Sequence, residues 1–265
     1  MHSLRRNLAI LVVALAWTNN SFCFQETTAT SRLHERARVK IVLRSSSSMD
    51  SPSPADSFKK QLLQLGASYD RGFGASPSAR KEALRVIDSL EALNLETDAA
   101  RGIAGDAMSP LEGSWRLIWT NAQDVLVLAA SPLSTVGAIY QVFDPPTVTN
   151  IIDLLPRAQA LLPPSLLPQS LIRAEVTTRA SPRRDKLNRV GLEFEAVKLK
   201  PVEVLGFEAG NLPSFAFGIP KIPGVDPEMS PGYFDVTFLD SEILIIRQNS
   251  PGGLFALVKV NCNDP

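Results

Sequence analysis

The chain has 265 residues, of which 45% are hydrophobic, 7% aromatic and 20% charged, and its formal net charge is zero. This length exceeds one average domain, although a β-barrel can take about 200 residues as one unit. The first 49 residues hold seven of the 27 basic residues and two of the 27 acidic ones, so the remainder has a net charge of −5, which disfavours nucleic-acid binding.

The amino-terminal segment has the composition of a targeting leader. Two arginines precede a short apolar run at residues 8–17, which is too short to span a membrane, and small residues flank a cleavage site after Cys23. The predicted signal peptide therefore covers residues 1–23. Residues 24–53, which begin with Phe24, are rich in Arg and Ser and poor in acids, as plastid transit peptides are. The alternative is plain secretion with a disordered pro-segment.

Residues 54–110 are predicted to form two helices and a polar linker. The first helix, over residues 58–65, is short. The second is predicted over residues 77–94, because Ser76 can cap it and a proline suits its first turn. Its apolar residues form one stripe, which comprises Ala83, Leu84, Ile87, Leu90 and Leu93. Between the helices, Arg71 is expected in a turn with its guanidinium in water.

Residues 113–120 form the first predicted strand. Strict alternation places Trp115, Leu117 and Trp119 on one side of it. Gly113 allows the chain to turn sharply into this strand, so that Trp115 covers the end of a barrel. The alternative is an ordinary buried tryptophan on a first strand.

Further strands are predicted with little helix between them. They cover residues 125–130, 137–143, 147–154, 170–179, 190–199, 202–207, 233–239, 242–247 and 254–260. Their number is close to the eight strands that close a small ligand-holding barrel. Residues 111–265 are therefore expected to form one mainly β domain, an antiparallel β-barrel preceded by one or two helices.

Two segments interrupt this pattern. Residues 155–171 hold six leucines, four prolines and one charged residue, a composition too broken for a core helix. Such a loop can cap a barrel mouth or contact a lipid surface, and the alternative is a loop folded onto the barrel wall. Residues 211–231 are rich in proline and are predicted to form a long, irregular connection. The membrane-contact candidates are Leu161, Leu162, Leu166 and Leu167.

Residues for most catalytic and metal sites are missing after the leader. Both histidines, His2 and His34, lie within it, which removes serine–histidine, cysteine–histidine and the usual zinc sites. Cys262 is then the only cysteine, so no internal disulfide is expected. Glu193 and Glu195 lie opposite the apolar face of their strand, as a solvated strand edge would. We therefore expect no enzyme activity, no cofactor and no metal.

Two motifs carry a resemblance to a known family. Leu111-x-Gly113-x-Trp115, together with Phe238-Leu-Asp240 through Arg247, resembles the plastid lipid-associated protein family, also called fibrillins or plastoglobulins. That family is similar to the lipocalins in fold, and the resemblance covers roughly residues 58–262. It implies that Gly-x-Trp opens the first barrel strand and that a late basic residue, here Arg247, lies across Trp115. The family often has a second arginine near the end, where this chain has leucine.

The resemblance implies a non-enzymatic protein that binds or organises carotenoids, prenylquinones or fatty acids at plastoglobules or thylakoids. The alternative is an interaction module that supports a lipid- or prenylquinone-synthesising enzyme, with the barrel filled by side chains. The two-part leader is similar to that of algae with secondary plastids, which implies residence there. The candidate residues for lining or closing the barrel are Trp115, Leu117, Trp119, Tyr140, Leu192, Phe194, Phe238, Asp240 and Arg247.

Overall fold

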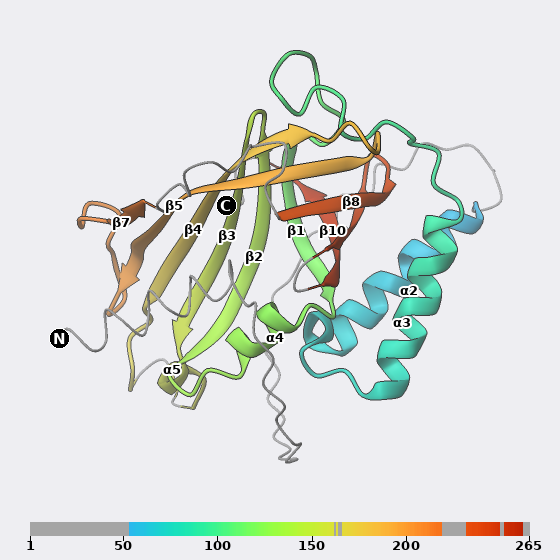
Figure 1. Cartoon of the computed structure of the whole chain (residues 1–265). Helices are drawn as coiled ribbons and strands as arrows, with labels where there is room; N and C mark the ends of the chain where they lie inside the picture. The colour runs from blue at the N-terminus through green and yellow to red at the C-terminus, as the bar shows by residue number, and fades with distance from the viewer. Residues whose placement is uncertain (1–52, 162, 164–165, 219–231, 250–251, 262–265) are drawn as a thin grey trace.

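The computed structural model describes residues 53–161, 163, 166–218, 232–249 and 252–261. In this part of the chain, eight antiparallel strands close a β-barrel, and two helices precede it and lie together against its outside (Figure 1). The predicted fold class, a mainly β barrel after amino-terminal helices, is confirmed. The predicted signal and transit peptides lie outside the described residues.

The two helices are α2 (Pro54–Ser68) and α3 (Pro77–Glu91), joined by the short 3-10 helix η1 (Asp70–Gly72). Ser53 caps α2 in a capping box with Asp56, and Ser76 caps α3 as predicted. Ala83, Val86, Ile87 and Leu90 of α3 pack with Leu62 of α2 against the outer surface of the barrel, whereas Leu93 of the predicted stripe lies beyond the helix and is exposed. The helices thus enclose a second core outside the barrel.

The barrel strands follow the order β1, β2, β3, β4, β5, β8, β9 and β10, and β10 returns beside β1. Two short strands pair with the far end of β5 outside this ring. The barrel strands are β1 (Gly113–Thr120), β2 (Ser134–Asp144), β3 (Thr147–Pro156), β4 (Leu171–Pro182), β5 (Arg189–Val204), β8 (Gly232–Leu239), β9 (Ile243–Gln248) and β10 (Gly253–Val260). The short strands are β6 (Phe207–Glu208) and β7 (Phe215–Gly218).

Two segments differ from the predicted pattern. The strand predicted at residues 125–130 is wrong, because helix α4 (Gln123–Ala129) occupies this stretch. Its buried residues, Val125 and Leu128, are three apart, a spacing that suits one helix face, and so short an apolar run does not distinguish helix from strand. The leucine-rich loop also contains a short helix, α5 (Arg157–Leu161).

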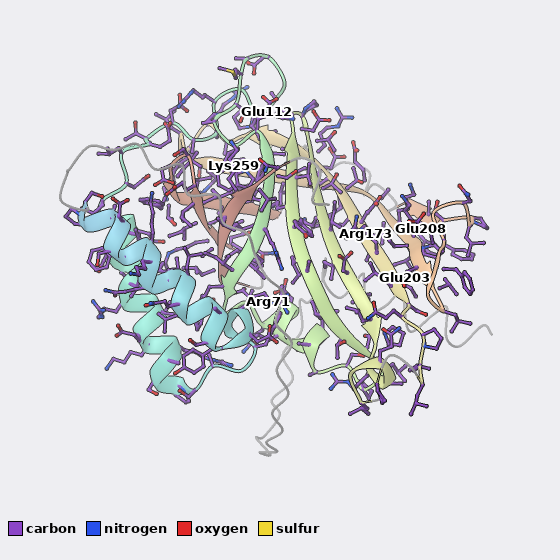
Figure 2. The ribbon with its side chains drawn as sticks, turned by 180° about the vertical axis from the view of Figure 1, so that it is seen from behind. Arg71, Glu112, Arg173, Glu203, Glu208 and Lys259 are labelled. Carbon is purple, nitrogen blue, oxygen red and sulfur yellow. The ribbon has the colours of Figure 1, made fainter. Side chains whose placement is uncertain are left out.

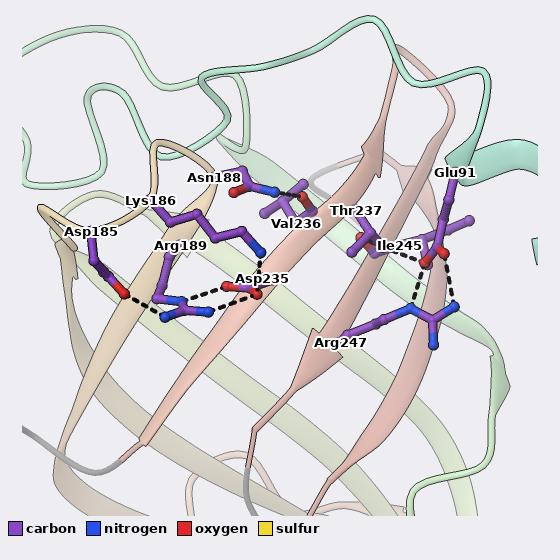
Figure 3. Close-up of polar contacts among 10 residues, drawn as sticks. All are labelled: Glu91, Asp185, Lys186, Asn188, Arg189, Asp235, Val236, Thr237, Ile245 and Arg247. Atoms are coloured by element: carbon purple, nitrogen blue, oxygen red, sulfur yellow. Dashed lines mark hydrogen bonds and ion pairs between the residues drawn. The ribbon is translucent and has the colours of Figure 1, made fainter. Parts of the chain in front are cut away.

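The barrel closes where β5 meets β8. This seam pairs only the first four residues of β5, Arg189 to Leu192, with β8. Arg189 lies opposite Asp235, and its Nε and Nη2 donate to the two carboxylate oxygens at 2.7 and 3.0 Å (Figure 3). Lys186 Nζ lies 2.8 Å from the same carboxylate. A charged cluster therefore reinforces a seam that has few backbone hydrogen bonds.

Candidate functional site

The interior of the barrel is densely filled beside β1, β8, β9 and β10. Five side chains from these four strands are fully buried in one contiguous core, namely Trp115, Leu117, Phe234, Leu244 and Leu257. Helix α4 contributes to the same core. This side of the barrel has no accessible apolar surface among the residues named, so it cannot hold a ligand without rearrangement.

The inner face of β3, β4 and β5 is buried over most of its length, for example at Ile152, Ala174 and Val197, but less so toward the end where β4 begins. Strand register places Leu154, Ile172 and Leu199 on the side that faces the interior, yet two of them are half-buried and Ile172 is exposed. Strand β7 extends this face, because Phe215 lies opposite Leu199 and Phe217 follows two residues later. These two phenylalanines are 55% and 47% exposed. We call these five residues the β3–β7 apolar strip.

The strip leads away from the helices. Figure 1 shows β7 beside the far end of β5, on the side of the barrel opposite α2 and α3. Two predicted lining residues, Leu192 and Phe194, are on the inner face of β5 and are half-buried. Leu117 is also on the inner face, on the filled side. An extended apolar molecule could therefore contact the strip from inside the barrel to β7.

Trp115 stands at the start of β1, with a cation over its ring. Its indole Nε1 donates to the carbonyl of Leu111 at 2.8 Å, and Lys259 Nζ lies 5.1 Å from the ring centroid. Gly113 has φ of 122°, and a Cβ there would lie 3.1 Å from Lys259 Cε. The glycine therefore leaves room for the lysine to reach the tryptophan. Figure 2 shows Lys259 near Glu112 at one end of β1 and Arg71 near the other.

The expectation that Arg247 lies across Trp115 is wrong. Arg247 leaves the outer face of β9, toward α3, whereas Trp115 is on the inner face two strands away. Its Nε and Nη2 donate to Glu91 at 2.8 Å each, and Nη2 also reaches Asp88 at 2.9 Å (Figure 3 shows the pair with Glu91). The hydrogen bonds that Arg247 donates to Glu91 raise the pKa of the Arg247 guanidinium. Arg247 thus fastens a helix to the barrel.

Two β-bulges move predicted lining residues to the outer face. A register shift between Leu117 and Trp119 places Trp119 opposite Ala256, in the core under the helices. A second shift, between Val236 and Phe238, does the same for Phe238. Simple alternation predicts both side chains on the barrel lining, because it does not allow for the extra residue that a bulge inserts.

Two further candidates also lie away from the lining. Tyr140 is on the outer face of β2, opposite Ile151, where it interacts electrostatically with Arg173. Asp240 is in the turn between β8 and β9, where its Oδ1 accepts from the backbone of Glu242 and Ile243 at 2.8 Å each. Its Oδ2 lies 2.5 Å from Lys59 Nζ of α2. Asp240 therefore ties a helix to a turn.

Exposed apolar side chains gather near α4 and α5. Of the membrane-contact candidates, Leu161 and Leu166 are 76% and 71% exposed, Leu167 is half-buried, and Leu162 lies outside the described residues. Val127 and Leu133 are exposed as well. The backbone N–H of Arg157 donates to the carbonyl of Leu133, and its guanidinium to that of Ala129, both at 2.9 Å, so the two helices lie close together. We call Val127, Leu133, Leu161 and Leu166 the α4–α5 patch.

Sequence reasoning missed the role of Arg71. Its guanidinium donates to the backbone carbonyls of Gly137 and of Val136, the latter at 3.2 Å, instead of lying in water. Gly72 follows with φ of 98°, and a Cβ there would lie 2.3 Å from the carbonyl oxygen of Thr120. The Arg-Gly pair between two helices was the available signal. It fixes the helix connection against β1 and β2.

The described residues contain no group of three or more His, Cys, Asp or Glu arranged to hold a metal ion. Glu195, on the outer face of β5, forms an ion pair with Arg179 at 2.9 Å. None of the helices in the described part of the chain combines the length and apolarity needed to cross a membrane.

These features define a small lipocalin-like barrel with an accessible apolar inner strip and a fastened helix pair. The chain belongs to the plastid lipid-associated protein (fibrillin) family, because the PAP_fibrillin family model matches residues 56–258. Members of this family are generally non-enzymatic structural proteins associated with plastids and their lipids. No curated protein and no solved structure gives a significant match.

Proposed function

We propose that this protein is a non-enzymatic carrier or organiser of hydrophobic molecules in a plastid, and that it holds them on the β3–β7 apolar strip. The observation that carries this proposal is the exposure of Ile172, Phe215 and Phe217 on a face that continues the barrel interior. Apolar surface of this kind is stabilised by contact with a hydrophobic ligand. Carotenoids, prenylquinones and fatty acids are ligands of this class.

The α4–α5 patch is the surface we assign to lipid contact. Its four exposed side chains come from two helices and the segments that follow them. Arg157 is the one charged residue of the sequence between residues 154 and 172, and its guanidinium is engaged with backbone carbonyls. A plastoglobule or thylakoid surface would cover these four apolar side chains while Nη2 of Arg157 stays hydrogen-bonded to backbone carbonyls.

Residues 1–53 are the proposed two-part targeting leader. A signal peptide ending at Cys23 and a transit peptide that begins with Phe24 would direct the protein into a secondary plastid. Replacing Phe24 with Ala in a fluorescent fusion should leave the protein outside the plastid stroma. Normal import of that variant would contradict the two-part leader.

A second candidate function is an interaction module that supports a lipid-synthesising enzyme. Exposed apolar side chains near β6, Leu205, Phe207 and Leu212, favour it. The two functions differ in what fills the inner face, because an interaction module needs no bound lipid. A lipid-binding assay therefore separates them.

The test of lipid binding uses two neighbouring positions on β4. Val176 faces the interior opposite Asn150, whereas Thr177 faces outward opposite Thr149. Diphenylhexatriene, a fluorescent polyene hydrocarbon, should bind the full chain. Val176→Trp should weaken this binding by about tenfold or more, because the indole overfills the inner face, and Thr177→Trp should leave it unchanged. Equal binding by both variants would contradict a site on the inner face.

A further inference from the structure

Two carboxamides occupy one cross-strand position on the inner face of the barrel. Gln141 of β2 lies directly opposite Asn150 of β3, and Trp115 of β1 lies opposite Gln141 on its other side. Side chains paired in this way have Cβ atoms about 4.5–5.5 Å apart. Phe143 and Val148, the next inward pair along these strands, belong to the interior core. Gln141 and Asn150 are therefore directed into the barrel.

Neither carboxamide has a hydrogen-bond partner among the described residues. Gln141 is only 7% exposed, and a buried amide that gives up water without finding a partner is unfavourable. The side-chain nitrogen and oxygen of Gln141 nevertheless remain accessible to a water-sized molecule. Asn150 is half-buried. The pair thus keeps unused donors and acceptors that are open to a water-sized molecule.

The inner face around the pair, on β2 to β5, is uncharged: the described residues that face inward there include no Lys, Arg, Asp or Glu. On β10, Lys259 faces inward opposite Trp115, so it lies two strands from Gln141 with the indole between them. A carboxylate or phosphate placed there would be buried without a counter-charge, which is strongly unfavourable. A neutral oxygen is different, because a carboxamide can both donate to a carbonyl and exchange hydrogen bonds with a hydroxyl.

The pair also begins a row of side chains that leads out of the barrel. Asn150 lies opposite Val176, which lies opposite Val197, which in turn lies opposite Phe217 of β7. Apart from the carboxamides this row is apolar. A chain laid across the strands along it would run from Gln141 to the exposed end of the β3–β7 apolar strip.

We propose that Gln141 and Asn150 bind the polar end of a neutral lipid through its carbonyl or hydroxyl oxygen, while its hydrocarbon chain lies on the β3–β7 apolar strip. This inference rests on the proposed lipid-binding function and specifies the chemistry of the ligand. The ligand class is an uncharged lipid with one hydrogen-bonding end, such as a quinone or an alcohol. Anionic lipids are disfavoured at this position.

The experiment compares three probes with alkyl chains of nine or ten carbons on the full chain of the protein. Decyl-benzoquinone carries carbonyl oxygens, decylbenzene carries none, and decanoate is anionic at neutral pH. Calorimetric titration should show that the quinone binds about 3- to 10-fold more tightly than decylbenzene, the range expected for one net hydrogen bond. Decanoate should bind most weakly.

Variants then assign the difference to the carboxamides. Gln141→Met and Asn150→Leu keep the approximate side-chain size and remove the amide, so each should reduce the preference for the quinone over decylbenzene to near unity. Affinity for decylbenzene should stay the same or rise. Thr149→Val, on the outer face next to Asn150, is the matched control and should keep the preference.

The urea midpoint of unfolding shows whether the Gln141 amide anchors a ligand or supports the fold. Because the amide of Gln141 has no hydrogen-bond partner in the part of the chain that the structure describes, Gln141→Met should leave the urea midpoint unchanged or higher. A fall in the midpoint, or failure to fold, would show that the amide supports the fold and would overturn the proposal. Equal binding of quinone and decylbenzene by the unaltered chain would overturn the anchor and leave the lipid-binding function standing. Binding of neither probe would overturn both.

Discussion

At the scale of single residues, Asp235 holds the seam that closes the barrel. Hydrogen bonds come to it from Arg189 opposite and from Lys186 in the preceding loop. Burial raises the pKa of the Asp235 carboxyl, but these hydrogen bonds together outweigh it and bring the pKa below its usual range. The ionised form of Asp235 is therefore the one that stabilises the closed barrel.

Replacement of Asp235 should lower the free energy of unfolding by an amount that depends on pH. Asp235→Asn is expected to lower the free energy of unfolding by about 1–2 kcal/mol at pH 7, after allowance for partial exposure of the pairs. Since the folded pKa is depressed, the contribution is present above the unfolded pKa of about 3.9 and is lost as pH falls through the folded pKa. Urea unfolding at pH 7 and at low pH measures this. A cost that stays the same at both pH values would refute the assignment.

Arg247 and Glu91 should be coupled energetically, and Arg247 and Trp115 should not. Glu91→Gln with Arg247→Met forms one double-mutant cycle, and a coupling energy of about 1 kcal/mol or more is expected from the bidentate contact. Trp115→Phe with Arg247→Met forms the second cycle, and its two effects should add within about 0.5 kcal/mol. Urea unfolding gives both values. Coupling in the second cycle alone would contradict the observed geometry.

At the scale of elements, the helix pair stabilises the barrel from outside. Leu62 of α2 is completely buried between the helices and the strands, while Leu95, just beyond α3, is almost fully exposed. Leu62→Ala should lower the free energy of unfolding by about 2–5 kcal/mol, and Leu95→Ala should change it by less than about 0.5 kcal/mol. Similar costs for both variants in urea unfolding would show that the helices do not share a core with the barrel.

The sequence predicts where the helices and strands lie better than it predicts which side of the barrel wall each side chain occupies. Capping residues and the apolar stripe located α3, and alternation located most barrel strands, because local chemistry decides both. Trp119 and Phe238 were assigned to the wrong face because each follows a bulge, and a bulge depends on pairing between distant strands. The same holds for Gln141 and Asn150, whose pairing appears only in the folded barrel.

At the scale of the whole molecule, the two halves of the barrel differ in what fills them. Large side chains such as Trp115 and Phe234 pack the half beside the helices, which makes it rigid. The half formed by β3, β4 and β5 keeps accessible apolar side chains and continues into β7. This asymmetry separates a structural half from the half proposed to hold lipid.

The most direct test of lipid binding is the identity of what the native protein carries. Protein isolated from plastids without detergent would be extracted, and the extract analysed by mass spectrometry beside that of the Val176→Trp variant. We expect one class of neutral lipid near a one-to-one ratio with the unaltered protein and its loss from the variant. Protein that folds normally and carries no lipid, or a variant that retains the same lipid, would contradict a binding site on the inner face.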